Sequence, residues 1–302
     1  QVHAAETRDG RPVVVKIQYP GVDETVEQDL KNVDALLQVL GRIARDVFGK
    51  TADVASLRDE LEERLREELD YRREAANLAR FRELFADDDE IEIPEVEPAL
   101  STRRVLTMTR LEGYPLADIL APGIDQEMKD WVARKYYRIV WRQLFRFSCL
   151  HTDPHPGNYR VTHHPHLGML DFGSVRVFPD AVRRQYVALA RGVLARDRKA
   201  MLGACRELGF LGAGDPEAPL AEVLEIVLEP LLADRDYDPA EYRTIDKAMR
   251  VANLVVEHRL FQSPGHRVFL MRALIGLESL MKQLGTVANW RRLLEEELPN
   301  GP

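Results

Sequence analysis

Apolar, β-prone runs on either side of a polar turn mark the first eighteen residues of the chain. Two β-prone runs, at residues 1–5 and 12–17, flank the tripeptide Arg8-Asp9-Gly10. An Asp-Gly pair between such runs is a strong signal for a β-hairpin. The pattern therefore predicts an antiparallel hairpin, which Tyr19-Pro20-Gly21 ends.

In the next segment, apolar residues recur at the three- and four-residue spacing of a helix with one buried face. One stretch carries Val26, Leu30, Val33 and Leu37, and a second runs from about residue 54 to residue 85. The second stretch is densely charged, so we expect most of its charges to lie on a solvated face with i,i+4 pairs. Two helices are predicted here.

Short strands then interrupt the helical pattern, which returns and dominates the rest of the chain. Strands are predicted at residues 91–98, 104–111, 159–161 and 167–170, and a long helix at about residues 126–147. Helices resume near residue 179 and continue to residue 298, with breaks near residues 212–216 and 262–265. Early strands and late helices predict an α+β fold with two lobes. We assign residues 1–111 to a small N-lobe and residues 112–302 to a helical C-lobe.

Composition and charge exclude several classes of protein. The 302 residues include 42 basic and 50 acidic side chains, and the resulting net charge of −8 argues against nucleic acid as a partner. Cys149 and Cys205 lie far apart without a Cys-x-x-Cys pair, so neither a disulfide framework nor a thiolate zinc site is predicted. The most apolar window, residues 268–284, contains charged side chains and should not span a membrane. We expect a cytoplasmic protein.

The strongest chemical signal is His151-Thr-Asp153-Pro-His-Pro-Gly-Asn158, followed by Asp171-Phe172-Gly173. Phosphoryl transfer needs one carboxylate near the attacking hydroxyl and another on the metal ion. Mg²⁺ prefers hard oxygen ligands, so a carboxylate and an amide oxygen suit it. The spacing predicts that Asp153 acts on the nucleophile and that Asn158 and Asp171 bind the metal. The alternative is a Pro-rich turn followed by a chance Asp-Phe-Gly.

A lysine and a glutamate are candidates for the phosphate-binding part of such a site. Lys16 ends the apolar run Val13-Val-Val, from which it could hold the α- and β-phosphates of a nucleotide. A kinase lysine needs a glutamate from a helix to orient it, and Glu74 is our candidate among many glutamates of the charged helix. Asp70 lies four residues earlier on the same face, so the two carboxylates would repel each other without a cation between them.

Three histidines allow two interpretations. His163, His164 and His166 resemble a metal-binding tract, but their place at a predicted hairpin tip favours solvated loop residues over a zinc site. The helix around residues 270–284 is likewise expected to be a core seam rather than a membrane or partner surface.

Five motifs follow one another along the chain. They are Gln1-Val-His-Ala-Ala, Asp9-Gly-Arg-x-Val-Val-Val-Lys16-Ile-Gln-x-Pro20-Gly21, Glu68-x-Asp70-Tyr-x-x-Glu74-Ala-x-Asn77, His151-x-Asp153-Pro-His-Pro-Gly-Asn158 and Asp171-Phe172-Gly173. Together they resemble the UbiB/ADCK (AarF-domain) family of atypical kinases, and the resemblance covers essentially the whole chain. Asp-Pro-His-Pro-Gly-Asn is far more specific than a generic kinase loop.

The resemblance implies a protein-kinase-like fold that binds ATP or ADP with Mg²⁺. Asp153 matches the catalytic aspartate of the family, and Asn158 and Asp171 match its metal ligands. The ATP-binding set that the resemblance implies consists of the lysine Lys16, its helix partner Glu74, and the hinge residues Met108, Thr109, Arg110 and Leu111. The family-specific acidic pair is matched by Glu68 and Asp70.

Two family segments are absent from the sequence. In the family, the acidic pair engages a lysine from an N-terminal helix with a Lys-x-Gly-Gln motif, and an Ala-rich loop covers the phosphates. We expect both segments to precede Gln1 in a longer protein. The chain also departs from many relatives at Thr109-Arg110, where an acidic residue is common, and at Thr152, where alanine is commoner.

The expected function is an atypical kinase or ATPase that supports isoprenoid-quinone (ubiquinone-type) biosynthesis or lipid metabolism. The resemblance implies a nucleotide and a lipid or quinone precursor as partners, and work at the periphery of a membrane. Two other classes stay open. One is a regulatory scaffold that binds nucleotide without turnover, and the other is a small-molecule phosphotransferase with the same His-x-Asp-x-x-x-x-Asn spacing.

Overall fold

The computed structural model describes residues 1–22, 69–162, 166–211, 214, 216–239, 245–258, 260 and 266–300. The chain divides into two compact units, one of residues 1–112 and 168–174 and the other of residues 113–167 and 175–302. The sequence-based division after residue 111 placed Asp171-Phe172-Gly173 in the second lobe, whereas the structure groups this segment with the first unit. The first predicted helix and residues 54–68 of the second lie outside the described residues.

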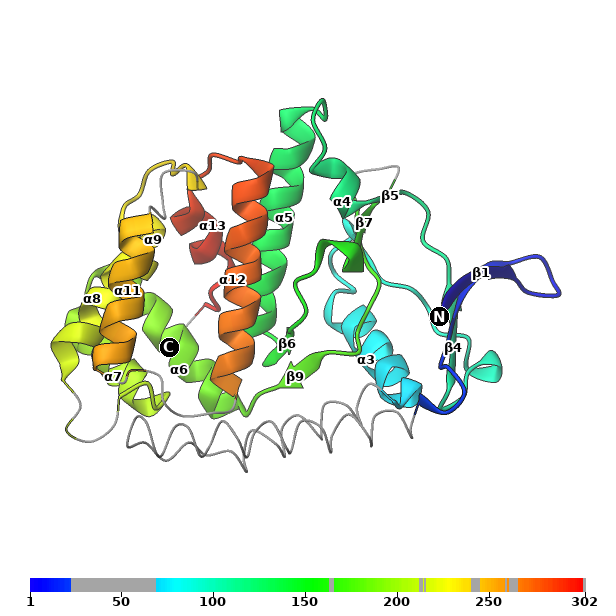
Figure 1. Cartoon of the computed structure of the whole chain (residues 1–302), viewed down its shortest axis with the longest axis horizontal. Coiled ribbons are helices and arrows are strands. Elements are labelled where there is room, and N and C mark those ends of the chain that lie inside the picture. The colour runs from blue at the N-terminus through cyan, green and yellow to red at the C-terminus, as the bar shows by residue number, and fades with distance from the viewer. Residues whose placement is uncertain are drawn as a thin grey trace. The chain divides into compact units, whose positions relative to one another are not determined.

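A three-stranded antiparallel sheet opens the first unit (Figure 1). The strands β1 (Val2–Glu6) and β2 (Pro12–Ile17) form the predicted hairpin, and β2 also pairs with β4 (Val105–Thr109). Gly10 has a φ of +87° in the turn, a backbone conformation that glycine adopts without steric cost. The central place of β2 puts Lys16 opposite Leu106 of β4.

Helix α3 (Tyr71–Leu84) follows a polar cap. The Asp70 side chain accepts a hydrogen bond from the backbone N–H of Arg72 at 3.0 Å, which satisfies one of the free donors at the helix start. The buried side chains of α3 are Glu74, Leu78 and Phe81, spaced four and three residues apart on one face. Charged side chains occupy most of the exposed positions of the helix, as the pattern predicts.

The strand predicted at residues 91–98 is much shorter in the structure. Only β3 (Ile91–Glu92) forms, and an isolated bridge joins Val96 to Met108. Pro94 and Pro98 have no backbone N–H and interrupt the ladder, and a 3₁₀ turn begins at Pro98.

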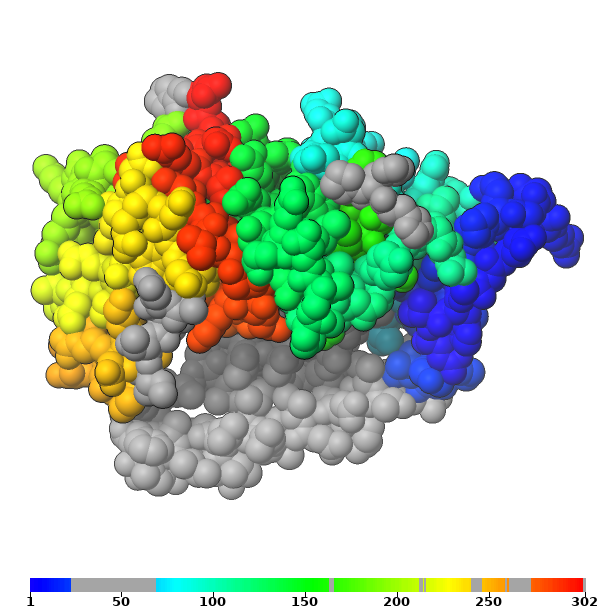
Figure 2. All heavy atoms as spheres, turned by 90° about the horizontal axis from the view of Figure 1, so that it is seen from above, coloured from blue at the N-terminus to red at the C-terminus, as the bar shows by residue number. Residues whose placement is uncertain are grey.

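Long helices make up most of the second unit. The predicted helix at residues 126–147 is α5 (Gln126–Phe145), and α12 (His266–Leu284) and α13 (Trp290–Glu297) pack on it. Figure 2 shows α12 and α13, in orange and red, beside the green of α5. The remaining helices of this unit are α4 (Leu116–Ile119), α6 (Asp180–Ala195), α7 (Arg198–Glu207), α8 (Glu217–Val227), α9 (Glu229–Leu232) and α11 (Ile245–Glu257). Among the described helices, none combines the length and the apolar character that crossing a bilayer requires.

Short strands flank the loop of residues 153–158, here called the motif loop, and those at residues 159–161 and 167–169 are where the sequence predicts them. Antiparallel pairing joins β6 (Cys149–His151) to β9 (Val175–Val177), with His151 opposite Val175. The strand β5 (Tyr114–Pro115) pairs with β7 (Tyr159–Val161), and β8 (Leu167–Met169) leads toward Asp171. The sequence does not predict β5, β6 and β9, because segments of two or three residues are too short to show a period of two.

An ion-pair network fixes α13 on α5. The carboxylate of Glu297, whose side chain is 2% exposed, accepts hydrogen bonds from Arg142 at 2.9 and 3.1 Å. Arg138 and Arg146, one helical turn to either side, lie at 4.0 and 3.7 Å from the same carboxylate. A buried carboxylate is tolerated only when cations and hydrogen-bond donors replace its lost hydration. The network is therefore a structural anchor of the second unit.

The substitution Glu297→Ala should lower the free energy of unfolding by about 3 kcal/mol, because it leaves Arg142 partly buried without its carboxylate. The matched control is Glu296→Ala. The Glu296 side chain is 51% exposed, so its loss should cost less than about 1 kcal/mol. Urea unfolding of both variants measures the difference, and equal losses would contradict the assignment of the anchor to Glu297.

Candidate functional site

Three of the predicted site residues meet in the first unit. The ammonium of Lys16 on β2 donates to Oε1 of Glu74 on α3 and, at 3.0 Å, to Oδ2 of Asp171. Lys16 and Glu74 are buried, with 8% and 5% of their surface exposed. The structure thus selects Glu74 among the glutamates that the sequence offered, and it brings together residues 58 and 155 positions apart.

The charges of this cluster are not balanced. Burial alone would lower the pKa of Lys16, but the carboxylates of Glu74 and Asp171 outweigh burial and raise its pKa above the ordinary value. Burial raises the pKa of Glu74, which the charge of Lys16 offsets only in part, and the charge of Asp171 adds to the rise. Lys16 is therefore an ammonium at neutral pH that two carboxylates share. The resulting excess of negative charge favours a further cation at the cluster.

Asp171 offers the accessible side of the cluster. Its side chain is 43% exposed, in contrast to those of its two partners. Oδ1 accepts a hydrogen bond from the backbone N–H of Gly173 at 2.9 Å, which fixes the carboxylate plane while solvent reaches it. A hard divalent cation binds to such an exposed and oriented carboxylate.

Helix α3 also holds the residue after Asp171. The carboxylate of Glu74 accepts from the backbone N–H of Phe172 at 3.3 Å, and Nδ2 of Asn77 donates to the Phe172 carbonyl at 2.9 Å. The Phe172 ring is fully buried and packs on the ring of Phe81, with 4.7 Å between centroids and 58° between planes. One face of one helix therefore binds the N–H, the carbonyl and the ring of Phe172, and this fixes the backbone that carries Asp171.

The sequence assigns no role to Phe81, and it marks Asn77 only as part of a family motif. Both lie on the face of α3 that carries Glu74, at the third and seventh positions after it. This helical spacing is the one sequence signal that links Asn77 and Phe81 to Glu74. It shows that the three side chains share a face, but it does not show that this face meets the Asp-Phe-Gly segment.

The predicted catalytic residue Asp153 and the predicted metal ligand Asn158 lie on the motif loop of the second unit. Nδ2 of Asn158 donates to Oδ2 of Asp153 at 2.8 Å and to the Asp153 backbone carbonyl at 3.3 Å. The bond holds the Asp153 carboxylate in one orientation, and the oxygen of the Asn158 amide remains as an acceptor. The loop itself starts from β6, where Oε1 of Gln143 on α5 accepts from the backbone N–H of His151 at 2.7 Å.

Packing within the second unit supports this loop from two sides. The rings of Tyr136 and Tyr159 meet edge to face at 4.9 Å between centroids, both buried. Burial raises the pKa of Tyr159 well above its ordinary range. From α12, Gly276 lies against Pro154, and a Cβ at this position would overlap the proline ring. The loop is therefore in tight contact with α12.

The structure describes all four residues of the predicted hinge and one residue of the acidic pair. Met108 is buried on β4 opposite Val14, and Thr109 follows it in the same ladder. Arg110 donates its backbone N–H to the carbonyl of Pro12 at 3.2 Å, and Leu111 is half-buried. Their role in binding adenine stays a prediction. Within the acidic pair, Asp70 is the cap of α3, whereas Glu68 lies outside the described residues, as do His163 and His164 of the histidine tract.

Comparison with known proteins gives concordant matches. The family model described as "ABC1 atypical kinase-like domain" matches residues 1–204. The "Atypical kinase coq-8, mitochondrial" of Caenorhabditis elegans is 32% identical over 98% of this chain and 39% of its own length. The "Atypical kinase COQ8, mitochondrial" of Saccharomyces cerevisiae is 31% identical over 98% of this chain and 59% of its own length. The "Probable protein kinase UbiB" of Cellvibrio japonicus is 30% identical over 94% of this chain and 51% of its own length. The chain thus spans about half the length of these relatives.

A solved structure shares the fold. The erythromycin complex of Rv3197 from Mycobacterium tuberculosis superposes with a TM-score of 0.78 at 28% identity, over 99% of this chain and 74% of that one. The α+β kinase-like fold predicted from the sequence is confirmed.

The substitution Lys16→Met should destabilise the protein by about 3 kcal/mol at pH 7, because it leaves Glu74 as a buried carboxylate without a cation. A buried carboxyl whose pKa is raised in the folded state binds protons more tightly there than in the unfolded chain. Stability of the variant relative to the parent should therefore rise as pH falls from 7 toward about 5. Urea unfolding at both pH values measures it.

The control for this effect is the double variant Lys16→Met/Glu74→Gln. Its loss of unfolding free energy relative to the parent at pH 7 should be smaller than that of the single variant. This loss should not depend on pH between 7 and 5, because the titrating carboxyl is gone. A single variant whose deficit is the same at both pH values would show that Glu74 does not depend on Lys16 for its charge.

The substitution Asn77→Leu should loosen the Asp-Phe-Gly segment. It removes the Asn77 hydrogen bond to the Phe172 carbonyl and replaces the amide by an apolar branched group with the same number of heavy atoms, a loss of about 1–3 kcal/mol. Hydrogen exchange of residues 168–174 should become faster, while that of the β1–β2 hairpin should not change. The control is Arg80→Leu on the exposed face of α3. Equal exchange rates of residues 168–174 in both variants would show that Asn77 does not hold the segment that carries Asp171.

Proposed function

Since the chain belongs to the UbiB/ADCK family of ABC1 atypical kinase-like proteins, we propose that it binds ATP with Mg²⁺ and transfers or hydrolyses the γ-phosphoryl group. The observation that carries the proposal is the Lys16 ammonium shared by the helix carboxylate of Glu74 and the Asp171 carboxylate. This arrangement is what a kinase needs to hold phosphate oxygens and a metal ion together.

Each member of the cluster has a proposed task. Lys16 is a charged ammonium, because its pKa is raised, and it would bind phosphate oxygens while Glu74 keeps it in place. Asp171 and Asn158 would bind Mg²⁺ through a carboxylate and an amide oxygen, the hard donors that suit this ion. When bound, Mg²⁺ neutralises charge on the phosphates. The exposed carboxylate of Asp171 and the excess negative charge beside it fit such an ion.

Asp153 is the proposed residue that acts on the nucleophile. Its carboxylate accepts a hydrogen bond from Asn158, and an ionised carboxyl group is an acceptor that suits an attacking hydroxyl or water. A carboxylate in this role orients the nucleophile and accepts its proton as the bond to phosphorus forms. The residues fit a protein, lipid or small-molecule acceptor as well as water. ATPase activity coupled to handling of a lipid precursor is as consistent with the site as protein phosphorylation.

Family membership also supports a proposal for the pathway. We place the activity in isoprenoid-quinone (ubiquinone-type) biosynthesis or in lipid metabolism, with a lipid or quinone precursor as partner at the periphery of a membrane. A non-catalytic nucleotide-binding scaffold is the alternative from another class, and a small-molecule phosphotransferase is a third. The Lys16–Glu74–Asp171 cluster and the Asn158–Asp153 bond favour turnover over the scaffold.

Metal-dependent nucleotide binding tests the role of Asp171. With a fluorescent ATP analogue, Asp171→Asn should weaken the Mg²⁺-dependent part of binding by more than about tenfold, because one metal ligand loses its charge. The control Asp89→Asn changes an exposed carboxylate of the same unit and should leave both affinities as in the parent. If the Mg²⁺ dependence of the two variants is equal, Asp171 is not a metal ligand.

Turnover tests Asp153 and separates the enzyme from the scaffold. The substitution Asp153→Asn should retain Mg²⁺-dependent binding of the analogue and lower the rate of ADP release by about 100-fold or more, because the nucleophile loses its base. Folding of the variant is checked by its urea midpoint. Parent protein that binds the nucleotide but releases ADP no faster than the variant would support the scaffold instead.

A further inference from the structure

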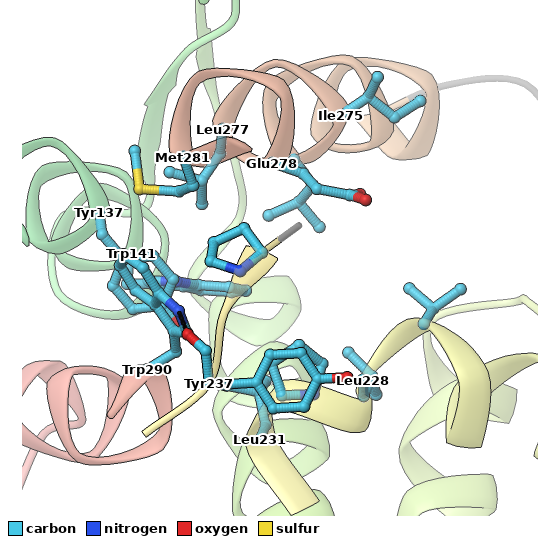
Figure 3. A pocket seen from close by; sticks show the side chains of 14 residues that line it. Tyr137, Trp141, Leu228, Leu231, Tyr237, Ile275, Leu277, Glu278, Met281 and Trp290 are labelled. Carbon is cyan, nitrogen blue, oxygen red and sulfur yellow. Dashed lines mark hydrogen bonds between the residues drawn. The ribbon is translucent and has the colours of Figure 1, made fainter. Parts of the chain in front are cut away.

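A second site of a different character lies within the second unit. A cavity of about 130 Å³, open to solvent over part of its surface, lies between α5, α9, α12, α13 and the segment after α9, and no residue of the phosphoryl-transfer motifs lines it. In Figure 3, α12 runs along one side with Leu277, Glu278 and Met281, and the rings of Tyr137, Trp141 and Trp290 group at one end. Apolar cavities near this size accept a single benzene ring. The volume therefore suits a compact molecule of about one ring.

The walls of the cavity favour a positive charge. Four aromatic side chains contribute to them, Tyr137, Trp141, Tyr237 and Trp290, and the face of an aromatic ring carries negative potential. Glu278 is the single charged side chain among the described lining residues, and none of them is basic. In Figure 3 the Glu278 carboxylate extends from α12 away from the grouped rings, so the cavity offers a negative charge on one side and aromatic rings on another, which suits an ammonium ion that carries an apolar group.

The Tyr237 ring already receives a cation, since the Arg235 guanidinium lies 4.8 Å from its centre, so Tyr137, Trp141 and Trp290 are the rings left for a ligand. A further observation points to a bound molecule. In the described part of the chain, Nε1 of Trp141 is buried and has no hydrogen-bond partner. An indole N–H that is buried normally finds an acceptor, which a bound molecule would supply beside its charged group.

Helix α12 joins this cavity to the motif loop. Leu277 and Glu278 line the cavity, and the preceding residue, Gly276, lies against Pro154 so closely that it has no room for a Cβ. Pro154 is bonded in sequence to Asp153. Closely packed elements transmit displacement because they leave no void to absorb it. A molecule that presses on the cavity side of α12 therefore acts on the loop.

We propose that this cavity binds a compact hydrophobic amine, with the protonated nitrogen beside Glu278 and the apolar part against the aromatic rings, and that binding orders the loop of Asp153 through α12. Binding itself does not depend on phosphoryl transfer. The consequence for activity rests on the function proposed above, and the measurements below do not require turnover.

Three probes with one ring and different charge test the assignment: benzylamine, benzyl alcohol and benzoate. Trp141 and Trp290 line the cavity and account for two of the three tryptophans, so quenching of tryptophan fluorescence reports binding, and calorimetry confirms it. Benzylamine should bind about tenfold more tightly than benzyl alcohol, and benzoate more weakly than both. Glu278→Gln should abolish the preference, whereas the exposed control Glu207→Gln should keep it.

Each result is decisive. If none of the probes binds, or if the alcohol binds as tightly as the amine, the cavity is not an amine site and the proposal is overturned. A preference that survives in Glu278→Gln overturns the role of its carboxylate. Hydrogen exchange of residues 151–158 should slow on addition of benzylamine to the parent and not to Glu278→Gln, and unchanged exchange in the parent overturns the coupling through α12.

Discussion

The first unit depends on one ammonium that two carboxylates share. Lys16 is buried on a central strand, so the sheet can form around it only when a negative partner enters with it. Glu74 supplies that partner from a helix, and Asp171 supplies a second from a distant segment. Three parts of the chain therefore meet at one charge. Because the two carboxylates exceed the single ammonium, the same constraint that assembles the unit leaves it ready for another cation.

One helix in each unit links stability to the site. In the first unit, the face of α3 that carries Glu74 also carries Asn77 and Phe81, and these hold the backbone and the ring of Phe172. In the second unit, α5 bears the anchor for α13 and presents Gln143 to the backbone of His151. Regular helices are rigid, so groups borne on one helix keep their spacing. The chemistry is thus positioned by elements that stability already requires.

The sequence predicts the features that depend on local pattern. The Asp-Gly hairpin and the long amphipathic helix α5 follow from turn chemistry and from the 3.6-residue period, and both lie where expected. The strand at residues 91–98 was overextended, since two prolines interrupt its ladder. The strands β6 and β9 were missed because three residues show no period. The bond from Asn77 to Phe172 joins residues 95 positions apart, and no local signal encodes which helix face meets which segment.

Residues 154–157, which lie between the two reacting groups of the motif loop, have a structural explanation of their own. Phosphoryl transfer needs only the carboxylate of Asp153 and the amide of Asn158. Between them, Pro154 packs on Gly276 of α12, and Nδ1 of His155 accepts from the backbone N–H of Gly157 at 3.0 Å. A Cβ at Gly157 would lie 2.8 Å from that ring nitrogen, so a larger residue there would displace the His155 ring from this bond. Among the residues that distinguish this loop from other kinase loops, Pro154 therefore fits it to a helix outside the reacting groups, whereas His155 and Gly157 shape its turn. Under the coupling proposed above, a ligand that acts on α12 reaches Asp153 through Pro154, its neighbour in the chain.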